Sequence, residues 1–485
     1  MIMSEKHNHG FIDGDGTDSY NSFSAAINSR EISTHKEKSN TYSIALNDLK
    51  KSAEVGDYDP YNYRDTEHPT TNKETFLHLL KGSLGTGILA MPLAFYHSGY
   101  VLGVVATALI GSLCMYCVHM LINCEYELCK RRKVPSMTYP TTAECAFQDG
   151  PPIFQRIAPY SQHIINVFLL IYQLGTGTVY TVFIGENIHL VLKENDIHID
   201  ARWVMLIFLL PLILINYVKN LKFLAPVSSF ANIVTMISFG IIVYFMVQQD
   251  IVWENREPFG SYKNYPLFFG TVLFALEAIG VIMPLENEMK TPKSFLGIYG
   301  VFNSAMTVIV ILYIGIGLYG YLAYGPDVGG SISYTIGNEI PAQVCKVMLS
   351  LAIYTSHPLQ MYPAIDTVWK QYLQPKLEKS SHQTFYEYAT RTFMVFFCFC
   401  LAAAVPYIDL FISLFGALSL SALGLAFPAL IYISTHWDSL KGVRGTMIIV
   451  RNIVIFCFAI VGLLIGTCTS LEKIIEKFSM KNSTL

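Results

Sequence analysis

The sequence predicts an all-α membrane protein with about eleven transmembrane helices, of which the first and the sixth are broken. Three observations support this fold class. Only 14% of the 485 residues are charged, whereas soluble domains carry about 25%. Hydrophobic residues make up 52% of the chain, and its mean hydropathy is +0.40. The charged residues gather in an N-terminal stretch and in short segments between long apolar runs, so lipid is the expected solvent for most of the surface.

Charge and cysteine usage exclude several classes of protein. The net charge of −3 provides no basic surface for nucleic acid, so no nucleic-acid partner is expected. The ten cysteines are scattered, and no CxxC pairs with a second CxxC or with a pair of histidines. We interpret them as small hydrophobic residues within helices. No metal site and no cofactor are predicted.

Composition divides the chain into three parts. Residues 1–73 are rich in Ser, Asn, Asp, Lys and His, and we predict a disordered cytosolic tail there. Residues 74–470 form the predicted transmembrane domain, and residues 471–485 form a short C-terminal tail, outside or lumenal. A span needs about 20 apolar residues. Eleven apolar runs of suitable length lie near 75–97, 101–124, 162–192, 203–218, 225–248, 267–286, 295–324, 341–366, 391–406, 408–434 and 446–470.

Lysine and arginine positions predict the orientation of these spans. With the N-terminus in the cytosol, sixteen basic residues fall in the inner loops and four in the outer loops. Basic residues are enriched in cytoplasmic loops, so the N-terminus is predicted to be cytosolic.

The first apolar run is interrupted by glycines. It reads HLLKGSLGTG from His78 to Gly87, with Pro92 one turn further on. Each glycine weakens a helix by roughly 1 kcal/mol relative to alanine. A run of small residues also suits close packing of two helices, and that interpretation stays open at this point. The functional interpretation is a broken helix, because irregular backbone at membrane depth must line a cavity or be buried in protein.

The sixth run has a comparable interruption, FALEAIGVIMPLENE, from residue 274 to residue 288. Glu277 lies within this apolar run and is followed by Gly280 and Pro284. A carboxylate at the centre of a membrane helix costs about 2.5–3.5 kcal/mol on insertion scales, so it indicates a functional site by default. A hydrogen bond from Glu277 to a neighbouring helix is the structural alternative.

The two interruptions occupy matching places in two sets of five spans of opposite orientation, which predicts an inverted 5+5 repeat. Paired broken helices of this kind indicate a transporter binding site. The free N–H groups at the start of a half-helix attract a carboxylate, and freed carbonyls hold an ammonium group. A free amino acid carries both groups on one carbon. The predicted substrate-binding residues are Gly82, Ser83, Gly85, Thr86, Gly87 and Gly280, together with Thr176 in the third span, for which core packing is the alternative.

His78 is the first candidate for proton coupling, and Glu277 is the second. The pKa of a free histidine side chain, about 6.5, allows exchange of a proton near physiological pH. His78 precedes Gly85 by seven residues, so on a continuous helix it lies two turns away on the same face. A histidine hydrogen-bonded near the membrane interface is the alternative. For Lys81, a structural role is favoured.

The motifs HLLKGSLGTGILAMPLAF (78–95), FALEAIGVIMPLENEM (274–289) and SHPLQMYPA (356–364) resemble those of the proton-coupled amino acid transporters of the amino acid/auxin permease group, and insect members in particular. The resemblance covers about residues 74–470. It implies a ten-helix inverted-repeat core with an added last helix, and symport of small neutral amino acids of the alanine, glycine and proline type with a proton. It associates His78 with proton coupling, and the glycine-rich break with the substrate. The oxygen ligands of sodium-coupled relatives are not identifiable, so the proton is the expected coupling ion.

Other functions stay open at this point. The long N-terminal tail would also suit an amino-acid sensor that signals nutrient availability to partner proteins with little net transport. An enzyme is disfavoured because the chain contains no HExxH or serine–histidine motif. A channel is disfavoured because no pore loop is repeated. The expected location is the plasma membrane or the lysosomal or late endosomal membrane.

Overall fold

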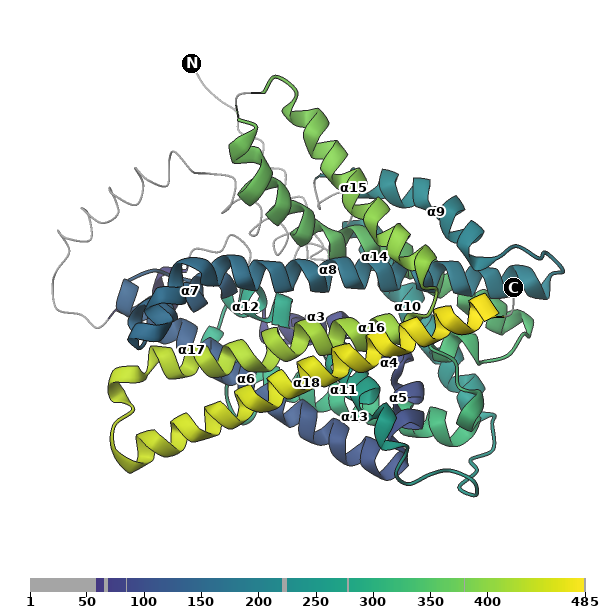
Figure 1. Ribbon diagram of the computed structural model, residues 1–485, viewed down its shortest axis with the longest axis horizontal. Coiled ribbons are helices and arrows are strands. Elements are labelled where there is room, and N and C mark those ends of the chain that lie inside the picture. Colours follow the sequence, from purple (N-terminus) through teal and green to yellow (C-terminus); the bar gives the residue numbers. More distant parts are fainter. Residues whose placement is uncertain are drawn as a thin grey trace, which may run out of the picture.

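The structure is a computed structural model that describes residues 58–64, 69–83, 85–219, 225–276, 279–378 and 380–483 (Figure 1). Within these ranges the protein is helical, and extended backbone pairs only in a single parallel bridge between Thr70 and Met289. The α-helices are α3 (Asn72–Ser83), α4 (Thr86–Leu89), α5 (Met91–Ser98), α6 (Tyr100–Arg132), α7 (Tyr139–Asp149), α8 (Pro152–Glu194), α9 (Ala201–Asn216), α10 (Ala225–Val247), α11 (Tyr265–Ala275), α12 (Ile279–Asn287), α13 (Val301–Tyr324), α14 (Ile340–Asp366), α15 (Gln383–Ala404), α16 (Ile408–Phe415), α17 (Phe427–Thr435) and α18 (Gly442–Ser483).

Short 3₁₀ and π segments complete the chain. The 3₁₀ turns are η1 (Pro60–Tyr63), η3 (Tyr262–Asn264), η4 (Pro292–Ser294), η5 (Gly325–Asp327), η6 (Ile332–Tyr334), η8 (Gln374–Lys376) and η10 (Trp437–Ser439). The π-helical segments are η7 (Thr367–Leu373), which extends α14, and η9 (Gly416–Ala426), which joins α16 to α17.

Seven described helices are long and apolar enough to cross a membrane, and they confirm the predicted all-α membrane fold. They are Tyr100–Arg132, Pro152–Glu194, Phe230–Val247, Val301–Asp327, Gln383–Ala404, Ile408–Thr435 and Gly442–Ser479. The helix α9 is apolar but shorter. The broken spans α3–α5 and α11–α12 consist of helices that are each too short to meet this criterion. The total of eleven spans and the inverted repeat stay predictions.

Helix α8 is the central element of the bundle. It runs through the length of the molecule and packs against α7, α9, α14, α15 and α16 (Figure 1). In the most apolar 18-residue stretch of α8, 61% of the residues are buried. In the corresponding stretch of the last helix, α18, 17% of the residues are buried. The outer face of α18 is therefore left for lipid, whereas α8 belongs to the protein core.

The π-helical segment η9 lies directly against α11, the first half of the broken sixth span. A methyl group added at Gly416 would overlap the Gly270 carbonyl oxygen, so the two backbones are in contact. A π segment leaves carbonyls without their usual partner, and the Tyr139 hydroxyl donates to the Leu423 carbonyl at 2.6 Å. Helix α7 thus stabilises the irregular part of the tenth predicted span.

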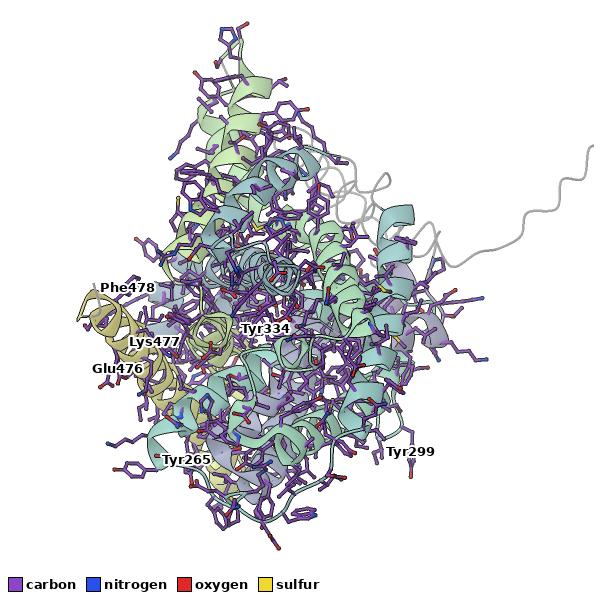
Figure 2. The ribbon with its side chains drawn as sticks, turned by 90° about the vertical axis from the view of Figure 1, so that its right-hand side faces the viewer. Tyr265, Tyr299, Tyr334, Glu476, Lys477 and Phe478 are labelled. Atoms are coloured by element: carbon purple, nitrogen blue, oxygen red, sulfur yellow. The ribbon has the colours of Figure 1, made fainter. Side chains whose placement is uncertain are left out.

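Figure 2 views the molecule from the end at which α18 finishes. Tyr334 of η6 lies near the middle of this view, whereas Glu476, Lys477 and Phe478 of α18 lie at its edge. The Tyr334 ring lies 6.2 Å from the ring of Phe183 in α8, so the loop between α13 and α14 rests on the central helix.

The ends of the folded region differ from the predicted boundaries. The predicted tail, 1–73, overlaps η1 and the start of α3, and residues 58–64 pack on the helices described below. Residues 1–57 lie outside the described residues. Helix α3 begins with a reciprocal pair, in which Glu74 Oε2 accepts from Thr71 N at 2.7 Å and Thr71 Oγ1 accepts from Glu74 N at 3.4 Å. At the other end, α18 continues to Ser483 through the predicted C-terminal tail.

Candidate functional site

Both predicted interruptions are breaks in the helices. Helix α3 ends at Ser83, Gly85 has extended backbone with φ −113° and ψ −153°, and α4 begins at Thr86. Helix α11 ends at Ala275, and α12 begins at Ile279. The ends of the first half-helices leave carbonyls without a partner in their own helix.

Tyr313 of α13 joins the two breaks. Its hydroxyl lies within hydrogen-bonding distance of the Ser83 carbonyl, at the end of α3, and of the Ala275 carbonyl, at the end of α11, the latter at 2.7 Å. The Tyr313 side chain is fully buried. A phenol has one proton to donate, so the two carbonyls share a single donor. The carboxyl-terminal ends of two half-helices therefore meet at one hydroxyl.

The glycines of the first break serve two purposes. A methyl group added at Gly87 would lie 2.6 Å from the Ala275 Cα, so this glycine permits α4 to touch the end of α11. At Gly82, Gly85 and Gly280 an added methyl group would meet no described atom within 4 Å. The alternative of close helix packing thus applies to Gly87, whereas the other three glycines have no close neighbour among the described residues.

The remaining predicted binding residues have separate surroundings. Ser83 is buried and its hydroxyl donates to the Leu79 carbonyl at 3.1 Å, and Thr86 is buried at the start of α4. Thr176 is buried in α8 and donates to the Tyr172 carbonyl at 3.0 Å, a bond within its own helix. The structure therefore shows a local partner for the Thr176 hydroxyl.

The two proton-coupling candidates differ in what the structure describes. His78 lies in α3, half-buried, before the break. Because α3 ends at Ser83, His78 and Gly85 do not lie on one continuous helix, and the expected two-turn alignment on a common face is wrong. Glu277 lies outside the described residues.

A second group of contacts holds the start of the folded chain to the same helices. We call it the N-terminal clamp: residues 58–64 and Thr70, with Glu125, Glu286, Glu288, Lys290 and Lys293. Arg64 lies 2.9 Å from Glu286 Oε2 of α12 and 3.9 Å from Glu125 Oε1 of α6. These three side chains are 4%, 1% and 1% exposed, so the charges are almost completely removed from solvent. The Arg64 guanidinium also donates to the carbonyls of Pro135 and Glu286, at 3.1 and 3.2 Å.

Electrostatics favour the charged form of Arg64. Burial alone would lower the pKa of the Arg64 guanidinium, but the carboxylates of Glu286 and Glu125 outweigh it and raise this pKa above its ordinary value. Tyr61 packs beneath the guanidinium, with its ring centre 4.7 Å from Arg64 Cζ. One cation thus lies between two buried acidic side chains.

The clamp continues along the chain to α3. Thr70 exchanges backbone hydrogen bonds with the segment after α12, donating to Glu288 O and accepting from Lys290 N, each at 2.9 Å. At the surface, Lys293 Nζ lies 2.8 Å from Asp59 Oδ2. Because Lys293 donates to it, the pKa of the Asp59 carboxyl is lowered. Both broken spans are therefore joined at this end as well as at Tyr313.

Comparison with known proteins identifies the family. The family described as transmembrane amino acid transporter protein matches residues 68–471. The chain belongs to this family. It is 40% identical over 434 residues to the proton-coupled amino acid transporter-like protein pathetic of Drosophila melanogaster, covering 89% of this chain and 91% of that protein. It is 26% identical over 414 residues to the amino acid transporter AVT3A of Arabidopsis thaliana, covering 84% and 90%.

Membership of this amino acid transporter family confirms the predicted resemblance and the expectation that the protein is not an enzyme. Amino acids are therefore its substrate class. The resemblance rested on three motifs, and two of them, the interrupted runs, form the breaks bridged by Tyr313.

Sequence reasoning missed Tyr313, Arg64, Glu125 and Glu286. Tyr313 stands in the middle of an otherwise apolar run, and a hydroxyl at that depth needs a partner. Glu125 lies near the end of a span, and Glu286 lies at the end of the helix that follows the second break. Each acidic residue was therefore a weak sign that a buried partner was present. Arg64 fell in the predicted tail, where polar composition concealed it.

Proposed function

We propose that this transporter carries small neutral amino acids, of the alanine, glycine and proline type, across a membrane in symport with a proton. The observation that carries the proposal is the meeting of the two helix breaks at Tyr313. Carbonyl ends of half-helices favour a positive charge, and the starts of the following half-helices favour a negative one. A zwitterion would match both.

The break supports a substrate with a neutral side chain. The described residues from Gly82 to Gly87 are glycine, serine and threonine, and none of them carries a charge. A methyl group added at Gly82, Gly85 or Gly280, next to these backbone groups, would meet no described atom within 4 Å. A charged substrate side chain would have no described partner of opposite sign at these residues.

Proton coupling is proposed on two grounds. The Drosophila relative is named as a proton-coupled transporter-like protein. His78 lies in α3, five residues before the carbonyl bound by Tyr313, and is half-buried. We propose His78 and Glu277 as the residues that exchange the proton, with the N-terminus in the cytosol. The membrane is proposed to be the plasma membrane or that of lysosomes or late endosomes.

Reconstituted vesicles test this proposal. Labelled alanine should accumulate inside the vesicles against its concentration gradient when the outside is acidic. This accumulation should disappear when an ionophore removes the pH difference. Uptake indifferent to the pH difference would contradict proton symport. Binding without uptake would instead favour the sensor, whose nutrient-signalling partners would act on the N-terminal tail.

The variant His78→Ala tests the coupling residue. Accumulation driven by the pH difference should fall to background, while exchange of labelled for unlabelled alanine at equal pH persists. His163→Ala, an exposed histidine of α8, is the matched control and should accumulate normally. Normal accumulation by His78→Ala would remove His78 from the mechanism.

A further inference from the structure

Tyr313 has an arrangement that an ordinary core tyrosine does not need. A buried phenol is satisfied by one carbonyl. Here both carbonyls within reach belong to the final residues of interrupted helices, Ser83 of α3 and Ala275 of α11. These segments lie 192 residues apart in the sequence, and α13 contributes the hydroxyl between them.

The electrostatics of this point favour a cation. The carboxyl-terminal end of a helix carries about half a negative charge, and its last carbonyls lack partners within the helix. Two such ends at one place repel each other unless a positive group or a donor lies between them. In broken-helix transporters, half-helix ends and freed carbonyls commonly coordinate the coupling ion. The Tyr313 hydroxyl stands at this place.

The packing of α13 against α5 keeps the Tyr313 hydroxyl in position. A methyl group added at Gly317 would lie 2.5 Å from the Phe95 ring, and one added at Gly320 would lie 2.6 Å from the Pro92 ring. Both contacts are with α5, directly after the first break. Because α13 lies against α5 along this side, it has little freedom to slide, and Tyr313 stays aimed at the two carbonyls.

We propose that Tyr313 is a positioning residue that holds the two half-helix ends together in the place of an inorganic cation. Its single proton partly neutralises both ends, and the remaining lone pairs of the two carbonyls accept from the ammonium group of the substrate. This inference rests on the proposed function, since it assigns the ammonium subsite. It follows that substrate binding needs no sodium.

Tyr313→Phe is the decisive variant, because it removes the hydroxyl and keeps the ring. The full-length protein in vesicles is assayed by exchange of labelled for unlabelled alanine, with equal pH on both sides. The assay is run in buffer that contains either choline or sodium as its monovalent cation. In choline, the KM of the variant should rise roughly tenfold, as expected for loss of a shared hydrogen bond, with the maximal rate within about twofold. Sodium should lower that KM, because the carbonyl ends now lack a donor.

Tyr324→Phe is the matched control. It makes the same change on the same helix, where the hydroxyl lies 3.5 Å from the Phe245 carbonyl. Its KM should equal that of the natural protein in both salts. A Tyr313→Phe variant with an unchanged KM, or with a raised KM that sodium does not lower, overturns the proposal.

The natural protein supplies a measurement that does not depend on folding of the variant. Its KM for alanine should be the same in choline and sodium, and a KM that falls severalfold in sodium overturns the proposal. No pH difference is present in this assay. Failure of proton-driven uptake would therefore disprove the proposed symport without affecting the test of Tyr313, whereas absence of alanine exchange would count against the proposed substrate.

Discussion

The N-terminal clamp and the Tyr313 bridge join the same two broken spans, but they do so with opposite chemistry. The clamp uses a cation between two carboxylates, with all three side chains at most 4% exposed. The bridge uses one neutral hydroxyl between two carbonyls. Breaking a buried ion pair by removing one partner costs about 3–5 kcal/mol, whereas a neutral hydrogen bond contributes about 0.5–1.5 kcal/mol.

This difference indicates a division of roles between the two ends of α3. A neutral hydroxyl can exchange its partners at low cost, which suits a place where substrate must arrive and leave. The clamp can open only if its charges find new partners or water. We therefore expect the clamp to determine stability, and the bridge to determine affinity for substrate.

The largest expected effect is that of Arg64→Ala. Removing the guanidinium leaves Glu125 and Glu286 buried without their cation, and we expect a loss of about 3–5 kcal/mol in the free energy of unfolding. The melting temperature of the purified protein in detergent measures it. Arg132→Ala is the matched control, because its ion pair with Asp149, at 2.6 Å, is 39% and 27% exposed and should contribute less than about 1 kcal/mol. Equal shifts for the two variants would show that the clamp is not a buried charge network.

Gly87→Ala should have the next largest effect, and it tests the close contact at the bridge. The added methyl group would lie 2.6 Å from the Ala275 Cα, a backbone atom that cannot turn aside. Overpacking of this kind costs about 1–3 kcal/mol. We expect a lower melting temperature and loss of alanine exchange, because the carbonyl ends bridged by Tyr313 are forced apart.

Gly82→Ala supplies the comparison for that variant. Gly82 lies within α3, and its added methyl group would meet no described atom within 4 Å. Alanine favours a helix by up to about 1 kcal/mol over glycine, so stability should be unchanged or higher. A loss of stability as large as that of Gly87→Ala would show that the contact with Ala275 is not what distinguishes the two glycines.

The sequence pattern predicted the two helix breaks because the residues that cause them are neighbours in the chain. The glycines from Gly82 to Gly87 and the interruption near Gly280 can be found from the chain alone, since they weaken a helix wherever it packs. The partner of those breaks could not be found in this way. Tyr313 meets Ser83 and Ala275 only after three distant segments have packed.

The N-terminal clamp was not predicted from the sequence, for a different physical reason. Polar composition before residue 74 resembles that of a disordered chain, yet Arg64 is buried by carboxylates that lie 61 and 222 residues further along. Hydropathy is averaged over a segment of the chain. It therefore does not reveal a single buried cation whose acidic partners lie far along the sequence. The predicted tail therefore extended too far into the folded region.

Asp59→Asn should have the smallest effect, and it tests whether the exposed edge of the clamp adds to its buried centre. The hydrogen bond from Lys293 lowers the pKa of the Asp59 carboxyl in the folded protein. A lowered folded pKa stabilises the protein above the unfolded pKa of about 3.9, and this contribution is lost as the pH falls through the folded value. At pH 6 the natural protein should thus have a slightly higher melting temperature than Asp59→Asn, and this difference should disappear below about pH 4.

High salt should reduce the difference in melting temperature at pH 6, because Lys293 is exposed. A difference that persists at low pH would mean that the Asp59 side chain does not act through its charge.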